Sequence, residues 1–378
     1  MQYFNVSLPS IGYVLPEEIV SSEEIESRLA PLYSRLKLPE GRLELITGIR
    51  ERRFWANGTL PGDKSIVSCE HAIAAAGIET SEIGALIHAS VCRDHLEPAT
   101  ACRVHDALGL SPDCVIYDVS NACLGLMNGV IQIANMIELG QIRAGLVVGT
   151  EGSRQLVETT IDELNRNETL SRKTIKTAIA SLTIGSGSCA ILLTHRELSP
   201  NASTISSAVA RAHTAHHKLC HSGADEAVAS GMQPLMETDS ETLMAEGIAT
   251  GVATFEKLMA SSGWSRDDFQ KTVCHQVGKA HRALMLQSLE IPVERDFATF
   301  DWLGNTGSVA LPLALAFAAQ SGHIASGDQV GMLGIGSGIN SVMLSAKWQE
   351  TRVQGTGEVP ASNKLQKSAE QVGTGDAH

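Results

Sequence analysis

The 378-residue chain contains few aromatic side chains, only 4% of its residues, but it contains 34 glycines. With 43% hydrophobic residues it still has enough apolar material for a large core, which must consist mainly of aliphatic and small side chains. A chain of this length is typical of two domains. The composition excludes a disordered, collagenous or coiled-coil protein.

Positive charge is also scarce, with 29 Lys and Arg against 42 Asp and Glu and a net charge of -13. A general nucleic-acid binder needs excess positive charge to displace counterions, so we expect no nucleic-acid partner. The apolar run at 309–319 is too short to span a membrane, and the N-terminus lacks a basic-then-apolar signal pattern. These absences predict a cytoplasmic protein.

The eight cysteines show no C-x-x-C spacing. Scattered cysteines are typical of reduced thiols, and they favour neither a disulfide framework nor a cysteine metal site. Their number alone does not indicate whether any of them is reactive.

Two stretches, 70–149 and 256–334, follow the same pattern. Each begins with a small-residue helix that ends at a glycine, Gly77 or Gly263, and each continues with a short apolar strand eleven residues further on. A pattern used twice predicts two copies of one α/β unit. We place the halves at about 1–196 and 197–348.

Each half also contains a helix without a polar face, at 124–139 and 309–319. A helix that is apolar all round is buried on all sides, so the two predict a central helix layer between two sheets. The segment 349–378 loses apolar periodicity and collects Gly, Ser, Gln and Lys, which predicts a flexible tail.

Cys123 is the first candidate for chemistry, because Asp118-Val-Ser-Asn-Ala-Cys123 leads from a strand into the buried helix. A helix N-terminus favours the thiolate, which is the nucleophilic form. The alternative is a small buried apolar residue. Asn305 occupies the repeat-equivalent position, since Gly140 and Gly322 each follow by seventeen residues. An asparagine here could instead be a helix cap.

Two further features stand at strand ends. His275 follows the strand at 272–274, where a side chain can point into a site at the edge of the sheet, although a hydrogen-bonded core histidine is the alternative. The run Gly334-Ile-Gly336-Ser337-Gly338 could offer backbone N–H groups to an oxyanion, or it could be a tight turn between strands.

Together these motifs resemble the thiolase superfamily, in particular its ketoacyl synthase III-like branch. The resemblance covers about 1–348 and also includes Thr47-Gly-Ile-Arg-Glu-Arg-Arg53. It implies a five-layer αβαβα sandwich made of two duplicated α/β halves, a homodimer, an acyl-accepting Cys123, and an oxyanion site at His275 and Asn305. It implies no cofactor and no metal.

Glu97 indicates the branch. In ordinary members of the ketoacyl synthase III family the matching position is apolar, commonly Phe. The motif Leu96-Glu97-Pro-Ala-Thr100 is similar to the OleA type, which condenses two fatty acyl-CoA molecules head to head. The segments 148–152 and 169–174 share this resemblance. It implies that Glu97 comes from the neighbouring subunit and acts as the base.

The chemistry agrees, because joining two simple acyl thioesters requires removal of an α-proton, which decarboxylation makes unnecessary. The sequence therefore predicts a non-decarboxylative Claisen condensation of two acyl-CoA molecules to a β-keto acid through an acyl-Cys123 intermediate. A decarboxylative ketoacyl synthase III with a malonyl carrier protein, acyl transfer to another nucleophile, and a non-catalytic binding protein remain alternatives. Glu97 could also be a solvated loop residue.

Two weaker signals remain. Arg50, Arg52 and Arg53 could contact the phosphate of CoA, or they could form a plain surface cluster. His213, His217 and His221 stand at i, i+4 spacing, but no carboxylate partner is visible, so we favour a polar surface over a metal site.

Overall fold

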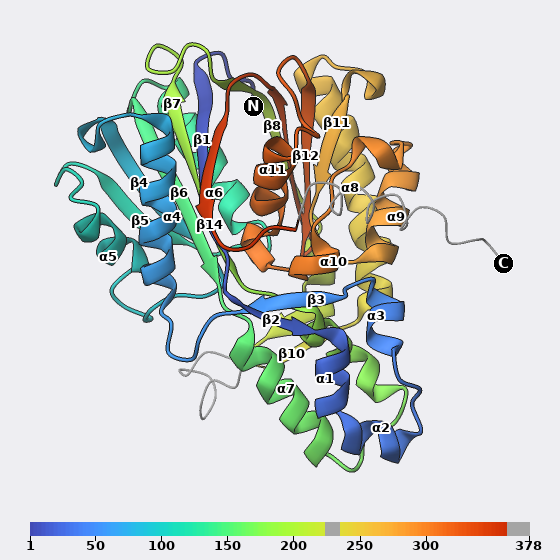
Figure 1. Ribbon diagram of the computed structural model, residues 1–378. Helices are drawn as coiled ribbons and strands as arrows, with labels where there is room; N and C mark the ends of the chain where they lie inside the picture. Colours follow the sequence, from blue (N-terminus) through green and yellow to red (C-terminus); the bar gives the residue numbers. More distant parts are fainter. Residues whose placement is uncertain (224–234, 361–378) are drawn as a thin grey trace.

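The computed structural model describes residues 1–223 and 235–360, and a large sheet runs through the molecule (Figure 1). Its strands follow the order β11-β12-β13-β8-β1-β7-β6-β4-β5, and β14 pairs with β1. The strands of the first half are β1 (Val6–Val14), β4 (Ile83–Ala89), β5 (Val115–Val119), β6 (Ala144–Glu151) and β7 (Gly187–His195). Those that follow are β8 (Ser203–Ala212), β11 (Lys271–Cys274), β12 (Gln329–Gly336), β13 (Asn340–Lys347) and β14 (Arg352–Thr356).

Strand directions repeat between the halves, as the sequence pattern predicts. The pairs β4–β6 and β11–β12 are parallel, whereas β6–β7, β12–β13, β7–β1 and β13–β8 are antiparallel. The counterpart of β5 is reduced to one parallel bridge between Thr272 and Asp296. The two sheets expected from the sequence are joined, because Ser7 and Leu8 of β1 pair with Thr204 and Ser203 of β8.

Helices cover both outer faces and fill the middle (Figure 1). The outer helices are α4 (Pro61–Ala76) and α5 (Thr100–Ala107) on the first half, and α8 (Ser240–Ser262) and α9 (Lys279–Leu289) on the second. Between the halves lie α6 (Gly125–Glu138) and α11 (Ala310–Gln320), and both contribute to the largest apolar core cluster. The predicted central helix layer is therefore confirmed.

Local chemistry explains where these helices begin and end. Gly77 and Gly263 adopt left-handed φ values of 67° and 74° directly after α4 and α8, a conformation that glycine adopts with little strain. Pro312 lies in the first turn of α11, where a missing N–H costs no helical hydrogen bond. Residues 310–318 of that helix are all buried.

A smaller layer of helices packs below the main sheet in Figure 1. It holds an apolar cluster of its own that includes Val20, Ile25, Val157 and Ile161. Its helices are α1 (Ser22–Arg28), α2 (Ala30–Leu36), α3 (Arg42–Thr47) and α7 (Arg154–Arg166), with the 3-10 helix Thr174–Thr183. There are also two short strand pairs, β2 (Glu18–Ser21) with β3 (Glu51–Phe54) and β9 (Cys220–Ser222) with β10 (Met236–Thr238). A short helix, α10 (Phe300–Leu303), precedes the turn that leads to α11.

The expectation of a flexible tail from residue 349 is wrong for its first part. Residues 352–356 form β14, which pairs with β1 from Ser10 to Val14. Strand β8 pairs with only the first part of that edge of β1, so β14 takes up the remaining backbone groups, which would otherwise be unpaired. The rest of the predicted tail, from 361 to 378, lies outside the described residues.

Within residues 1–223 and 235–360, no helix is long and apolar enough to cross a lipid bilayer.

Candidate active site

Cys123 lies in a tight turn between β5 and α6. The residue before it, Ala122, has a left-handed φ of 45°, and the backbone N–H of Leu124 closes the turn on the carbonyl of Asn121. Gly336 at the end of β12 packs against this turn, since a Cβ at that position would lie 3.7 Å from Cβ of Cys123. Backbone from the second half of the chain therefore approaches the thiol of the first half.

The pKa of the Cys123 thiol is raised to about 12, first because burial disfavours the thiolate and then because of the negative charge of Glu151. The sequence predicted the opposite shift from the helix N-terminus. Burial outweighs the helix dipole here, so the raised pKa favours the thiol form of Cys123 over the thiolate.

His275 follows β11, and its backbone N–H donates to the carbonyl of Leu333 on β12 over 3.0 Å. The side chain is buried, and burial together with His281 lowers its pKa to about 3. Its Nδ1 atom has no hydrogen-bond partner among the described residues. The imidazole is therefore neutral at physiological pH, and its buried Nδ1 atom is left unpaired by the described residues.

Asn305 lies in the 304–308 turn that leads toward α11. Its backbone is fixed by two hydrogen bonds, to the carbonyl of Thr183 and from the N–H of Gly185, at 3.0 and 2.9 Å. Its side-chain Oδ1 accepts a hydrogen bond of 3.0 Å from the N–H of Gly307. The amide is thereby oriented with Oδ1 as the acceptor and Nδ2 as the group that remains able to donate.

Shared neighbours place the chain segments that carry these three residues in one region. Both Cys123 and His275 contact β12, at Gly336 and at Leu333. The Asn305 turn is tied to Glu151, whose charge acts on Cys123. Their roles as nucleophile and oxyanion donors stay a prediction that this geometry supports.

Glu151 is the residue of this region to which the sequence analysis assigned no role. It is the last residue of β6 and only 5% exposed, and its carboxylate accepts hydrogen bonds from the 91–99 segment and from Ser308. The signal in the sequence is an acidic residue that directly ends an apolar strand. Such a buried carboxylate requires hydrogen-bond donors.

Glu97 lies on the 91–99 segment between β4 and α5. It is exposed, and the same segment exposes Val91 and Leu96, at 45% and 52% of their surfaces. Its carboxylate has no hydrogen bond or ion pair within the described part of the chain. One chain on its own therefore presents Glu97 to solvent, beside the exposed apolar side chain of Leu96.

The glycine run forms the turn between β12 and β13. Gly336 pairs with Asn340, and the carbonyl of Ser337 accepts a hydrogen bond from Asn340 Nδ2 over 3.2 Å. Gly338 has a left-handed φ of 129°. The turn alternative is therefore correct for the local structure, and donation of backbone N–H groups from Gly336, Ser337 or Gly338 to an oxyanion stays a prediction.

The three arginines of the predicted CoA contact have different environments. Arg52 and Arg53 are buried, at 0% and 2% exposure, because they hold backbone carbonyls of Val20, Leu182 and Pro16. Buried guanidinium groups with these bonds are not available to a phosphate at the surface. Only Arg50, with 52% of its side chain exposed, keeps that expectation.

The histidine patch is not one helical face. Residues 214–219 form a 3-10 helix and 220–222 a strand, so His217 and His221 point to Thr214 and Glu237. His213 and His216 instead approach Glu246 on α8, with the ligand atoms of all three residues within 4.8 Å of one another. The carboxylate beside these histidines is therefore Glu246, which is distant in the sequence.

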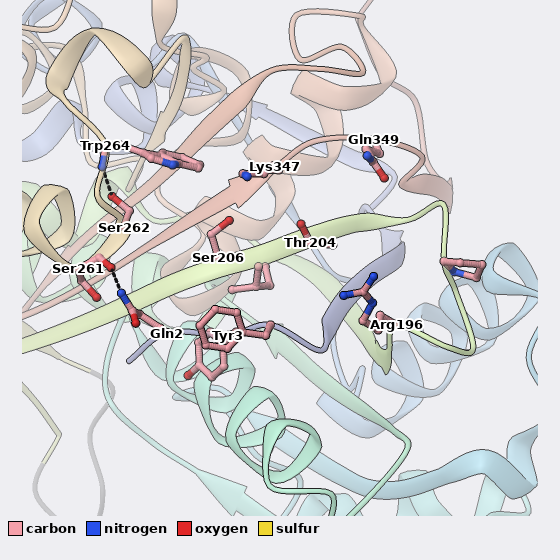
Figure 2. A pocket seen from close by; sticks show the side chains of 13 residues that line it. Gln2, Tyr3, Arg196, Thr204, Ser206, Ser261, Ser262, Trp264, Lys347 and Gln349 are labelled. Carbon is pink, nitrogen blue, oxygen red and sulfur yellow. Dashed lines mark hydrogen bonds between the residues drawn. The ribbon is translucent and has the colours of Figure 1, made fainter.

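A surface pocket of about 410 Å³ lies between the N-terminus, β8 and the end of α8 (Figure 2). Gln2, Trp264 and Lys347 line it, and Gln2 donates to the carbonyl of Ser261 over 2.8 Å. Its lining includes none of the predicted site residues, so this pocket is separate from the Cys123 region.

Comparison with known proteins places this geometry in a family. Residues 259–348 match the family described as 3-oxoacyl-[acyl-carrier-protein (ACP)] synthase III C terminal. An acyl-CoA:acyl-CoA alkyltransferase of Shewanella oneidensis is 43% identical over 92% of this chain and 100% of its own length. A protein of the same name from Xanthomonas campestris is 33% identical over 92% and 100%.

Solved structures agree. Xanthomonas campestris OleA, in a Cys-to-Ser variant with bound lauric acid and lauroyl-CoA, superposes with a TM-score of 0.85 at 32% identity, over 92% of this chain and 100% of that one. The thiolase-like fold implied by the resemblance is thus confirmed. The chain belongs to the OleA family, in the ketoacyl synthase III-like branch of the thiolase-superfamily acyltransferases.

Proposed function

We propose that this protein joins two fatty acyl-CoA molecules by a non-decarboxylative Claisen condensation. Glu97 carries the choice of reaction, because joining two simple acyl thioesters requires a base that removes an α-proton, and Glu97 is an exposed carboxylate without a partner among the described residues. The curated relatives support the proposal through their name, acyl-CoA:acyl-CoA alkyltransferase. The substrate class of this chain is accordingly acyl-CoA, in fatty acid metabolism.

In the first half-reaction, Sγ of Cys123 attacks the thioester carbon of one acyl-CoA. The oxyanion accepts hydrogen bonds from His275, which is neutral, and from Asn305, whose amide is oriented before substrate arrives. The C–S bond to CoA then breaks, and the thiol proton of Cys123 leaves with CoA. Removal of this proton is coupled to the attack, because the resting thiol has a pKa near 12.

In the second half-reaction, Glu97 takes the α-proton of a second acyl-CoA. The resulting enolate attacks the acyl carbon on Cys123, a carbon–carbon bond forms, and the bond to Sγ breaks. Cys123 regains a proton, and hydrolysis of the remaining thioester yields CoA and a β-keto acid. The steps use carboxylate, imidazole, amide and thiol, so we propose that no metal or other cofactor takes part.

We further propose a homodimer in which Glu97 removes the α-proton of an acyl-CoA bound in the neighbouring subunit's active site. The exposed apolar side chains of Val91 and Leu96 support this arrangement, since contact with a second chain would bury them. Exposed Arg50 is the proposed contact for CoA. All eight cysteines are free thiols, which fits a reducing, cytoplasmic compartment.

The test is mass spectrometry of the products formed from one long acyl-CoA, with and without a malonyl carrier protein. A β-keto acid, or the ketone from its spontaneous decarboxylation, without any malonyl donor is the expected result. A product that needs the malonyl donor would assign the decarboxylative reaction instead. Release of free fatty acid or transfer to an added nucleophile without chain joining would also overturn the proposal.

A further inference from the structure

Glu151 is held by four donors at the end of β6. Its Oε1 accepts from the N–H of Val91 at 3.0 Å and from the N–H and Oγ of Ser308 at 3.3 and 2.5 Å, while Oε2 accepts from the N–H of Cys92 at 3.2 Å. Burial raises its pKa, and these hydrogen bonds act against that rise. Since every partner donates, the site is built for an ionised carboxylate.

On one side, this carboxylate defines the turn that carries Asn305. A Cβ on Gly307 would lie 3.2 Å from the Glu151 carboxyl carbon, and Gly307 has a left-handed φ of 58°, so glycine is needed there. The N–H of the same glycine orients the Asn305 amide. A shift of Glu151 would therefore move the predicted oxyanion donor.

On the other side, the carboxylate anchors the start of the 91–99 segment. A second anchor follows at Asp94, whose side chain is 4% exposed and accepts from the N–H of Gly62 at 2.7 Å and from Arg103 at 3.0 Å. Glu97 stands three residues beyond. The two buried carboxylates thus determine where the tip of the segment projects.

We propose that Glu151 is a positioning residue that couples the Asn305 turn of its own active site to the segment that delivers Glu97 to the partner subunit. The inference rests on the proposed function, in which Glu97 acts across a dimer. One carboxylate then sets the oxyanion donor of one site and the base of the other. Through this coupling, a shift of Glu151 would affect acylation in its own subunit and condensation in the partner subunit.

Heterodimers with a single working cysteine test the coupling. In the first, one subunit carries Glu151→Gln and an intact Cys123, and its partner carries Cys123→Ala. In the second, Glu151→Gln is moved to the subunit with Cys123→Ala. The measured rates are acylation of Cys123 by labelled acyl-CoA and condensation to product.

We expect slower acylation in the first heterodimer, because the Asn305 turn loses its anchor. In the second, acylation stays at the rate of the reference heterodimer without Glu151→Gln, while condensation falls by up to about 100-fold, as expected for misplacement of a reacting group by about 1 Å. Normal condensation in the second heterodimer would overturn the coupling, and so would normal acylation in the first.

Two further variants guard against trivial explanations. Glu26→Gln is the matched control, because Glu26 is also buried and accepts two backbone N–H groups, from Gly41 and Leu43, away from the site. Its rates of acylation and condensation should be unchanged. If Glu26→Gln slowed them as much as Glu151→Gln does, the effect of Glu151→Gln would be explained by general destabilisation. If Glu151→Gln does not fold, Ser308→Ala removes one link alone and should slow acylation in the first arrangement only. Slower acylation in both arrangements would contradict the inference that Glu151 anchors the Asn305 turn only within its own subunit.

A third heterodimer separates this inference from the proposed function. It carries Glu97→Ala on the subunit with Cys123→Ala. Retained condensation there would overturn the role of Glu97 across the dimer, whereas acylation in the first heterodimer would still report on the link between Glu151 and Asn305.

Discussion

The carboxamide oxygen of Asn305 accepts a hydrogen bond of 3.0 Å from the backbone N–H of Gly307, and this bond fixes which end of the amide carries the Nδ2 donor. We predict that Nδ2 donates to the substrate oxygen. Asn305→Asp keeps the acceptor and replaces the donor with a second, charged acceptor. We expect acylation of Cys123 to slow by about 10²- to 10³-fold, as for other oxyanion donors. Single-turnover labelling measures the rate, and an unchanged thermal midpoint shows that the fold is intact. Acylation within a factor of two of wild type would exclude Asn305 as an oxyanion donor.

Glu97→Gln should separate the two half-reactions. The amide is similar in shape but cannot take up an α-proton, so labelled acyl groups should accumulate on Cys123 while β-keto product disappears. Intact-protein mass spectrometry detects the adduct. Condensation that survives this change would remove Glu97 from the mechanism.

Cys123 should react slowly with iodoacetamide at neutral pH. With a pKa near 12 the thiolate fraction falls about tenfold for each pH unit below that value. The alkylation rate should therefore still be rising at pH 10, above the ordinary thiol pKa of 9.0. Peptide mass spectrometry follows Cys123 specifically. A plateau below pH 8 would show that the helix N-terminus dominates after all.

Replacement of Arg52 should lower stability, whereas replacement of Arg50 should weaken the binding of acyl-CoA. Arg52→Ala leaves buried acceptors on Val20, Ser22 and Leu182 without their donor, which should lower the free energy of unfolding by about 2–4 kcal/mol. Arg50→Ala should leave stability unchanged and raise KM for acyl-CoA. Urea unfolding and steady-state kinetics provide the two measurements. An Arg52→Ala protein of unchanged stability with a raised KM for acyl-CoA would show that Arg52 contacts CoA after all.

Chelation should leave activity unchanged. His213, His216 and Glu246 form the candidate ligand cluster, but all three are at least partly exposed, and the proposed reaction has a carboxylate as its base. Dialysis of untagged protein against EDTA, followed by the condensation assay, tests this. Lost activity that zinc restores in wild type, but not in His216→Ala, would establish a functional metal.

Short-range patterns were enough for much of the architecture. Glycine caps after α4 and α8 and two helices without a polar face predicted a duplicated α/β fold with a buried central layer, and the structure confirms it. Helix capping and amphipathicity depend on residues a few positions apart, so they can be recognised in one sequence. The motifs around Cys123, His275, Asn305 and Glu97 indicated the family, which the comparisons confirm.

Long-range contacts decided the rest. Arg52 and Arg53 stand in the same basic run as Arg50, but they are buried. Their burial depends on backbone carbonyls that are distant in the sequence, so it cannot be recognised from the run itself. Likewise, Glu151 binds donors that are 60 and 157 positions away in the chain. Burial at Cys123 is also a property of the packed site, and it raises a pKa that the helix N-terminus alone would lower. The residue types at the site can thus be recognised in the sequence, whereas their charge state and their coupling arise only when the two halves pack together.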